Sequence, residues 1–202
     1  AFFLTLLEGW VGAKLVDTVL DSITITIHLL LALIIIGLII YSAIQAYYAI
    51  AGNFESKSSY HPHTKPVILG ILVCIFIEII IGTEIRGGLD MSRKENPLIE
   101  GVILLKMLGP FKYMHTILGF TLLGLTIYLW KIVNDIKFIS SSFMVNSVNF
   151  IMGLIISQII LGEALVFLEV KPLMQLFHMW FSSLLVGLSV ASFTFYKISM
   201  EK

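Results

Sequence analysis

The sequence predicts an all-α membrane protein, a pseudo-symmetric transmembrane helix bundle built from repeated helical hairpins, with about six helices. Three observations support this. Of the 202 residues, 58% are hydrophobic and only 13% are charged, too few charges to give each helix of a soluble domain a polar face. Several apolar runs reach the roughly 20 residues that a helix needs to cross a bilayer. Polar residues, glycines and histidines also recur at matched spacings along the chain.

Six apolar segments follow one another, and lipid obliges each spanning segment to satisfy its own backbone as a helix. They are expected at Phe2–Leu20, Ser22–Ala51, Pro66–Arg86, Pro110–Val133, Phe143–Glu169 and Pro172–Ile198. Gly52-Asn53 is predicted to end the second segment and Gly87-Gly88 the third. Pro110 and Pro172 stand at first helical positions of the fourth and the sixth. The apolar stretch Leu98–Leu108 is too short to span, so we expect a helix lying in the membrane interface.

Charge and cysteine content exclude some classes of function. The formal net charge is zero, and no basic patch is interleaved with aromatic residues, so lipid and not nucleic acid is the expected environment. Cys74 is the only cysteine, which excludes an internal disulfide. Basic residues are divided between both faces, so the positive-inside rule does not settle the orientation, although it slightly favours a cytoplasmic C-terminus.

An internal repeat relates the two ends of the chain. Glu8-Gly-Trp-Val-Gly12 and Gln158-Ile-Ile-Leu-Gly162 each place a polar residue four positions before a glycine. A histidine follows each polar residue after 20 positions, His28 in the first copy and His178 in the second. Because the series matches without a gap, the first two and the last two segments are predicted to be copies of one hairpin.

The middle of the chain holds a related hairpin with a longer loop. Glu78-Ile-Ile-Ile-Gly82 has the same polar–glycine spacing, and His115 follows on the next segment. A repeat made of two hairpins predicts a fourth hairpin upstream of Ala1. The predicted division is residues 1–51 as the second hairpin of an N-terminal four-helix bundle, 52–65 as a polar loop, and 66–202 as a C-terminal four-helix bundle.

His28, His115 and His178 are predicted to lie at one depth in the membrane. Each follows the start of its helix by a few residues, which places the imidazoles about 8–9 Å below one surface. Intramembrane polar side chains face the bundle interior, and neutral imidazole is an axial ligand of haem iron. The residue four positions after each histidine is small and leaves room for a neighbouring helix or a flat macrocycle: Ala32, Gly119 and Ser182. We expect His115 and His178 to clamp one haem and His28 to ligate another; hydrogen-bonded packing is the alternative for each histidine taken singly.

Other polar residues leave two interpretations open. Arg86 suits a haem propionate and equally an interfacial anchor. Glu84 either relays protons near the haem or pairs with Arg86. His61 and His63 fall on the opposite face and are expected to be solvated. Zinc is disfavoured, because no compact cluster of cysteines or carboxylates accompanies the histidines at their depth.

The motifs resemble one family, the haem A synthases. Gly82-Thr-Glu-Ile-Arg86 resembles the family's GTxVR signature. The stretch from Gln158 to His178 looks like its seventh and eighth helices, and the stretch from Glu8 to His28 is similar to its third and fourth. The resemblance implies two pseudo-symmetric four-helix bundles, each holding a haem between two histidines near the extracytoplasmic surface.

The resemblance also implies function. His115 and His178 would hold haem b, and His28 would be one of two ligands in the half that oxidises the C8 methyl of haem O to a formyl group, giving haem A for cytochrome oxidase. The implied location is a bacterial cytoplasmic membrane or the mitochondrial inner membrane. Implied partners are haem O synthase or cytochrome oxidase assembly factors, with an electron donor that the family does not identify; homo-oligomerisation stays open.

The chain departs from the family pattern at several positions. The helix that carries the family's Glu-x-x-His-Arg motif is not in this sequence, so catalytic residues are left unassigned. Thr116 follows His115 where arginine is frequent, and Glu8 and Glu78 replace the more usual glutamine. Two alternatives therefore remain: a bis-histidine haem b subunit for electron transfer or quinone chemistry without synthase activity, and a non-catalytic membrane subunit or transporter with structural histidines.

Overall fold

The structure is a computed structural model that describes residues 2–17, 21–51, 59–96, 98–99, 101–168 and 171–200. Within these residues it contains seven helices: α1 (Phe2–Asp17), α2 (Ser22–Ala51), α3 (Thr64–Glu95), α4 (Gly101–Met107), α5 (Phe111–Val133), α6 (Ser142–Phe167) and α7 (Pro172–Met200). Five of them, α2, α3, α5, α6 and α7, are long and apolar enough to cross a membrane. The predicted all-α membrane bundle is confirmed.

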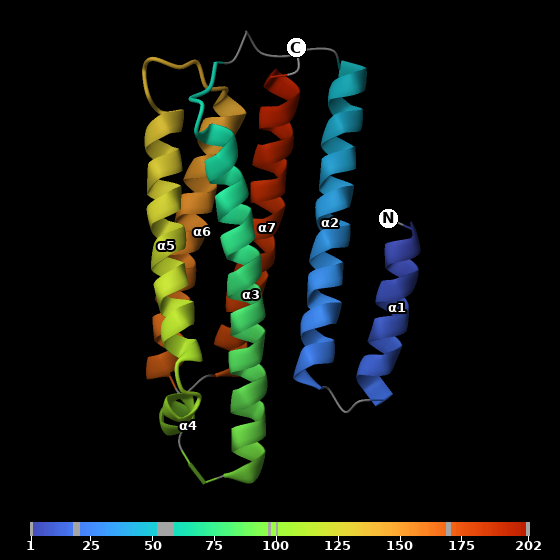
Figure 1. The fold of residues 1–202 in the computed structure, drawn as a ribbon, viewed down its shortest axis with the longest axis vertical. Coiled ribbons are helices and arrows are strands. Elements are labelled where there is room, and N and C mark those ends of the chain that lie inside the picture. The colour runs from blue at the N-terminus through green and yellow to red at the C-terminus, as the bar shows by residue number, and fades with distance from the viewer. Residues whose placement is uncertain are drawn as a thin grey trace.

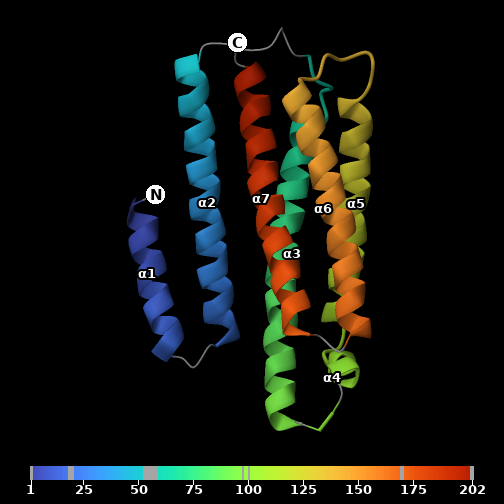
Figure 2. The same ribbon diagram turned by 180° about the vertical axis from the view of Figure 1, so that it is seen from behind.

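Four helices, α3, α5, α6 and α7, pack as a bundle, and α2 lies against α7 and α3 on its outside (Figure 1). α1 packs against α2, as the reverse view in Figure 2 also shows. α2, α5 and α7 run in one direction, and α1, α3 and α6 run in the other. The starts of α2, α5 and α7 therefore lie towards one end of the molecule, as the repeated hairpins predict, and α4 lies at this same end.

The bundle's apolar core fills the end away from α4. The buried residues of α5 fall between Leu122 and Val133, those of α6 between Met144 and Ile155, and those of α7 between Leu185 and Ile198. In α3 they concentrate in residues 64–79. Because lipid is as apolar as these side chains, close packing between helices holds this end together.

Most predicted helix boundaries are correct to within a few residues. α2 has the predicted range, and α7 begins at Pro172 as expected. Pro110 is the N-cap of α5 and not its first residue. α6 begins after Ser141, whose hydroxyl oxygen accepts a hydrogen bond from the backbone N–H of Met144 and so satisfies a free donor of the first turn.

Some predictions fall outside the described residues. These are the ends expected at Leu20 and Glu169, the Gly52-Asn53 turn and residues 52–58 of the polar loop. As described, α1 has 16 residues and is shorter than a membrane-spanning helix.

The predicted end of the third segment, Arg86 followed by Gly87-Gly88, is wrong. α3 runs through both glycines to Glu95. A Cβ atom on Gly87 would collide with the side chain of Ser22 in α2, and one on Gly88 would collide with that of Leu108. The glycines therefore allow two segments to approach α3 closely, and the helix continues because a glycine lowers helix stability by only about 1 kcal/mol.

The short helix predicted within Leu98–Leu108 is present as α4. Leu104 is fully buried and forms a small cluster with Leu89 of α3. Ile103 and Met107 are exposed. α4 is thus apolar on its packed side and on part of its exposed side, and its position in a membrane interface remains a prediction.

Candidate functional site

Two of the repeated hairpins join a carboxylate on one helix to a histidine on the next. Oε1 of Glu8 in α1 lies 3.0 Å from Nδ1 of His28 in α2. Oε2 of Glu78 in α3 lies 2.5 Å from Nδ1 of His115 in α5. Both carboxylates are largely enclosed, with side-chain exposures of 16% and 12%. The sequence showed that the pattern repeats, but it did not predict that the polar residue contacts the histidine.

The third hairpin makes a different contact at the same position. Nε2 of Gln158 in α6 donates hydrogen bonds to the backbone oxygen of His178 and to Oγ of Ser182, each at 2.7 Å. Nδ1 of His178 and Oε1 of Gln158 have no hydrogen-bond partner among the described residues. The amide therefore contacts the backbone of α7 and leaves the His178 ring unsupported at Nδ1.

The repeated glycine makes room for the imidazole in all three hairpins. A Cβ atom on Gly12 would lie 3.1 Å from Cε1 of the facing histidine. The corresponding distances for Gly82 and Gly162 are 3.4 Å and 3.8 Å. A Cβ atom would crowd the ring at Gly12, whereas at Gly82 and Gly162 it would be in ordinary contact with it. The fixed spacing of polar residue, glycine and histidine therefore brings each glycine against the imidazole of the next helix, most tightly at Gly12.

The small residues that follow the histidines accept the polar side chain of the preceding helix. A Cβ atom on Gly119 would lie 3.2 Å from Oε1 of Glu78. Ser182 receives the amide of Gln158. In these two hairpins the space that the sequence predicted for a helix or a macrocycle holds part of a side chain.

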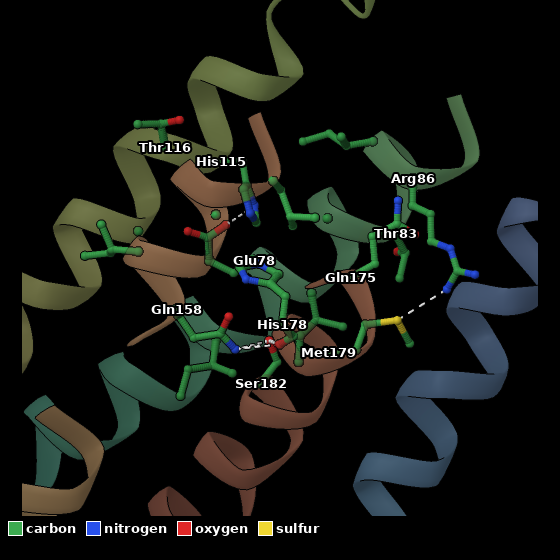
Figure 3. A pocket seen from close by; sticks show the side chains of 18 of the residues that line it. Glu78, Thr83, Arg86, His115, Thr116, Gln158, Gln175, His178, Met179 and Ser182 are labelled. Carbon is green, nitrogen blue, oxygen red and sulfur yellow. Dashed lines mark hydrogen bonds and ion pairs between the residues drawn. The ribbon is translucent and has the colours of Figure 1, made fainter. Parts of the chain in front are cut away.

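His115 and His178 lie close together in the interior of the bundle. Their ring centres are 6.2 Å apart and their planes make an angle of 60° (Figure 3). An imidazole nitrogen binds a first-row metal at about 2 Å, so two rings on opposite sides of one metal ion have centres about 6 Å apart. The separation fits the two axial ligands of one haem iron.

A cavity of about 290 Å³ adjoins this histidine pair. Its walls come from α2 to α7 and are mainly apolar, with contributions such as Leu29, Ile79 and Ile155. Gly82, Gly119 and Gly162 also line it. Polar side chains, among them Glu78 and Gln158, line the cavity as well. A mainly apolar wall with a small number of polar groups, and no side chains at the glycines, leaves a space that suits a flat ligand with an apolar body.

Arg86 lies at the wall of this cavity. Its Nη1 donates a hydrogen bond to Sδ of Met179 at 3.3 Å (Figure 3). Its Nε lies 3.9 Å from a carboxylate oxygen of Asp90. A thioether is a weak acceptor, so the guanidinium retains capacity for an anion. The pairing of Arg86 with Glu84 is not found: Glu84 instead accepts a hydrogen bond from Oγ1 of Thr26, at 3.4 Å.

The remaining histidines lie apart from this pair. His28 faces Glu8, and within the described residues no second histidine lies opposite it. His61 and His63 lie before and at the start of α3, at the opposite end of the bundle, as predicted. His63 is exposed, as predicted, and its Nδ1 lies 2.7 Å from the hydroxyl oxygen of Tyr128.

A family match covers most of the chain. The sequence profile of COX15-CtaA, described as cytochrome oxidase assembly protein, matches residues 1–190. The chain belongs to this family. Neither the curated proteins nor the solved structures give a match.

Membership of the haem A synthase family gives the chain a role in cytochrome oxidase assembly and haem A biosynthesis, which is an oxidoreductase function. Together with the five long apolar helices, it identifies an integral, multi-pass membrane protein.

Proposed function

We propose that this chain provides a haem b site in a haem A synthase, which converts the C8 methyl of haem O to a formyl group and yields haem A for cytochrome oxidase. The observation that carries the proposal is the histidine pair of α5 and α7, with ring centres 6.2 Å apart beside a cavity. Family membership supports the same chemistry.

The residues around the cavity have separate tasks in this proposal. His115 and His178 would hold the haem iron, and Gly82 and Gly162 leave space for the two rings. Arg86 binds a propionate at the cavity wall. A bound haem b supplies one-electron redox chemistry, and the apolar walls exclude water from it.

His28 is assigned to the other half of the protein, as one ligand of the substrate haem. Glu8 fixes its ring through Nδ1, in the manner of carboxylates that orient metal-bound histidines. We propose that the histidine-bearing end faces the extracytoplasmic side of a bacterial cytoplasmic or mitochondrial inner membrane. Haem O synthase or other assembly factors would be partners there.

Pigment analysis tests this proposal. The full-length protein, purified from membranes and extracted with acidic acetone, is expected to release haem b together with haem O or haem A, identified by mass spectrometry. Protein that folds and contains none of these haems contradicts the proposal.

Electron transfer without haem O oxidation is the second candidate function. The observation that supports it is the facing pair of His115 and His178, because a haem held by two histidines is sufficient for electron transfer. Incubation of the reduced protein with haem O and an oxidant separates the candidates. A synthase forms haem A and loses this activity in His28→Ala while retaining haem b, whereas an electron-transfer subunit retains haem b and forms no haem A.

A further inference from the structure

We propose that the carboxylate of Glu78 makes His115 the stronger and more firmly oriented of the two haem ligands, and that it thereby lowers the reduction potential of the haem. This inference rests on the proposed function, because it requires haem b between His115 and His178. It assigns Glu78 as a positioning residue that acts through His115.

The two histidines differ in what supports their Nδ1 atoms. Nδ1 of His115 lies 2.5 Å from Oε2 of Glu78. No carboxylate lies within ion-pair distance of Nδ1 of His178 among the described residues, since the residue at the equivalent position is Gln158, which bonds to the backbone oxygen. A carboxylate beside the second ring nitrogen fixes the tautomer and orientation of a ligating histidine and makes it a stronger donor. The pair is therefore electronically unequal.

Glu78 is enclosed, which strengthens the electrostatic effect of its carboxylate on His115. Its side chain is 12% exposed, and Gly119 leaves just enough room for Oε1, 3.2 Å from where a Cβ atom would lie. Ile75 and Ile79, on the same helix, line the cavity beside it. Electrostatic interactions are less screened in such surroundings than in water.

The sign of the effect follows from charge. Oxidation removes one electron from the haem and leaves it more positive. A carboxylate that contacts an axial ligand stabilises this oxidised form more than the reduced form, so the reduction potential falls. Among the described residues, His178 has no carboxylate beside its ring, because the residue there is Gln158, which bonds to its backbone oxygen, so His178 does not lower the reduction potential in this way.

The chain offers its own substitutions for a test. Glu78→Gln gives the α3–α5 hairpin the same amide side chain that the α6–α7 hairpin carries at Gln158. A redox titration of the purified protein, followed through the haem absorbance bands, is expected to show a higher midpoint potential in Glu78→Gln. A tenfold change in the relative stability of the two oxidation states corresponds to about 59 mV for one electron. The low-spin signal of the oxidised haem in electron paramagnetic resonance should shift as well.

Glu84→Gln is the matched control. It removes a carboxylate from the same helix, but among the described residues Glu84 bonds to Thr26 and forms no ion pair with a histidine. Its midpoint potential is expected to stay close to that of the unaltered protein. An equal shift in Glu84→Gln, or no shift in a Glu78→Gln protein that retains haem, would overturn the inference.

Gln158→Glu provides an independent test if Glu78→Gln loses its haem. A carboxylate near His178 should lower the midpoint potential and make the two ligands more alike. A potential that does not fall contradicts the inference. The failure of the proposed function is distinguishable, since in that case the unaltered protein contains no haem b.

Discussion

The two ends of the four-helix bundle are filled in different ways. At the end away from α4, the interior is packed with large apolar side chains, among them Ile68, Leu129 and Ile151. At the end where α5 and α7 begin, the interior instead holds histidines, glycines and a cavity of about 290 Å³. A chain that needed only stability could fill both ends with leucine and isoleucine. In the proposed function the open end holds the haem, and the packed end is the scaffold that positions it.

The largest effect is expected from filling the open end. In Gly162→Leu the new side chain would occupy the space beside His178, so we expect nearly complete loss of bound haem without loss of the helical fold. The measurement is the ratio of haem absorbance to protein. Gly153→Leu is the matched control, because Gly153 lies on the same helix and a Cβ atom there would meet nothing within 4 Å; this variant should bind haem normally.

A substitution in the packed end should lower the stability of the protein and leave haem binding unchanged. Ile151→Ala removes a side chain that is 1% exposed and should lower the free energy of unfolding by about 2–5 kcal/mol, the range for large-to-alanine changes in cores. The haem spectrum should not change at temperatures where the protein is folded. Ile156→Ala, on the exposed side of α6, should cost much less. Thermal unfolding in detergent checks both; a normal melting temperature in Ile151→Ala would show that the packed end is not the scaffold.

The smallest effect is expected at the cavity wall. Arg86→Gln should weaken haem binding by about 1 kcal/mol or less, because the guanidinium is 44% exposed and its attraction to a propionate is screened. Titration of the haem-free protein with haem measures this change. Lys94→Gln, at the exposed end of α3, serves as the charge control. Equal affinities in the two variants would favour the interfacial-anchor interpretation of Arg86.

The sequence predicted the parts of the fold that depend on periodicity. The range of α2 follows from a continuous apolar run, and the start of α7 follows from a proline at its first residue. Both signals are local in the sequence, so these helix boundaries were predicted correctly. The end of α3 was not predictable, because glycine serves both as a helix terminator and as a close-contact residue. Only the neighbouring Ser22 and Leu108 show which role Gly87-Gly88 has.

The candidate site also has features that the sequence predicted and features that it did not. The matched spacings predicted that His115 and His178 belong to equivalent helices, and the structure places their rings together. The contacts at Nδ1 were not predictable, because a carboxylate and an amide at equivalent positions reach different atoms. Glu78 meets a ring nitrogen, whereas Gln158 meets a backbone oxygen.

Spectroscopy of the haem ligands tests the central claim most directly. Resonance Raman spectra of the purified full-length protein are expected to show six-coordinate, low-spin haem b. His115→Ala and His178→Ala should each abolish this signal, by loss of haem or by conversion to a high-spin form, while His63→Ala, at the opposite end of the bundle, should leave it intact. Six-coordinate, low-spin haem b at full occupancy in both His115→Ala and His178→Ala would contradict the account.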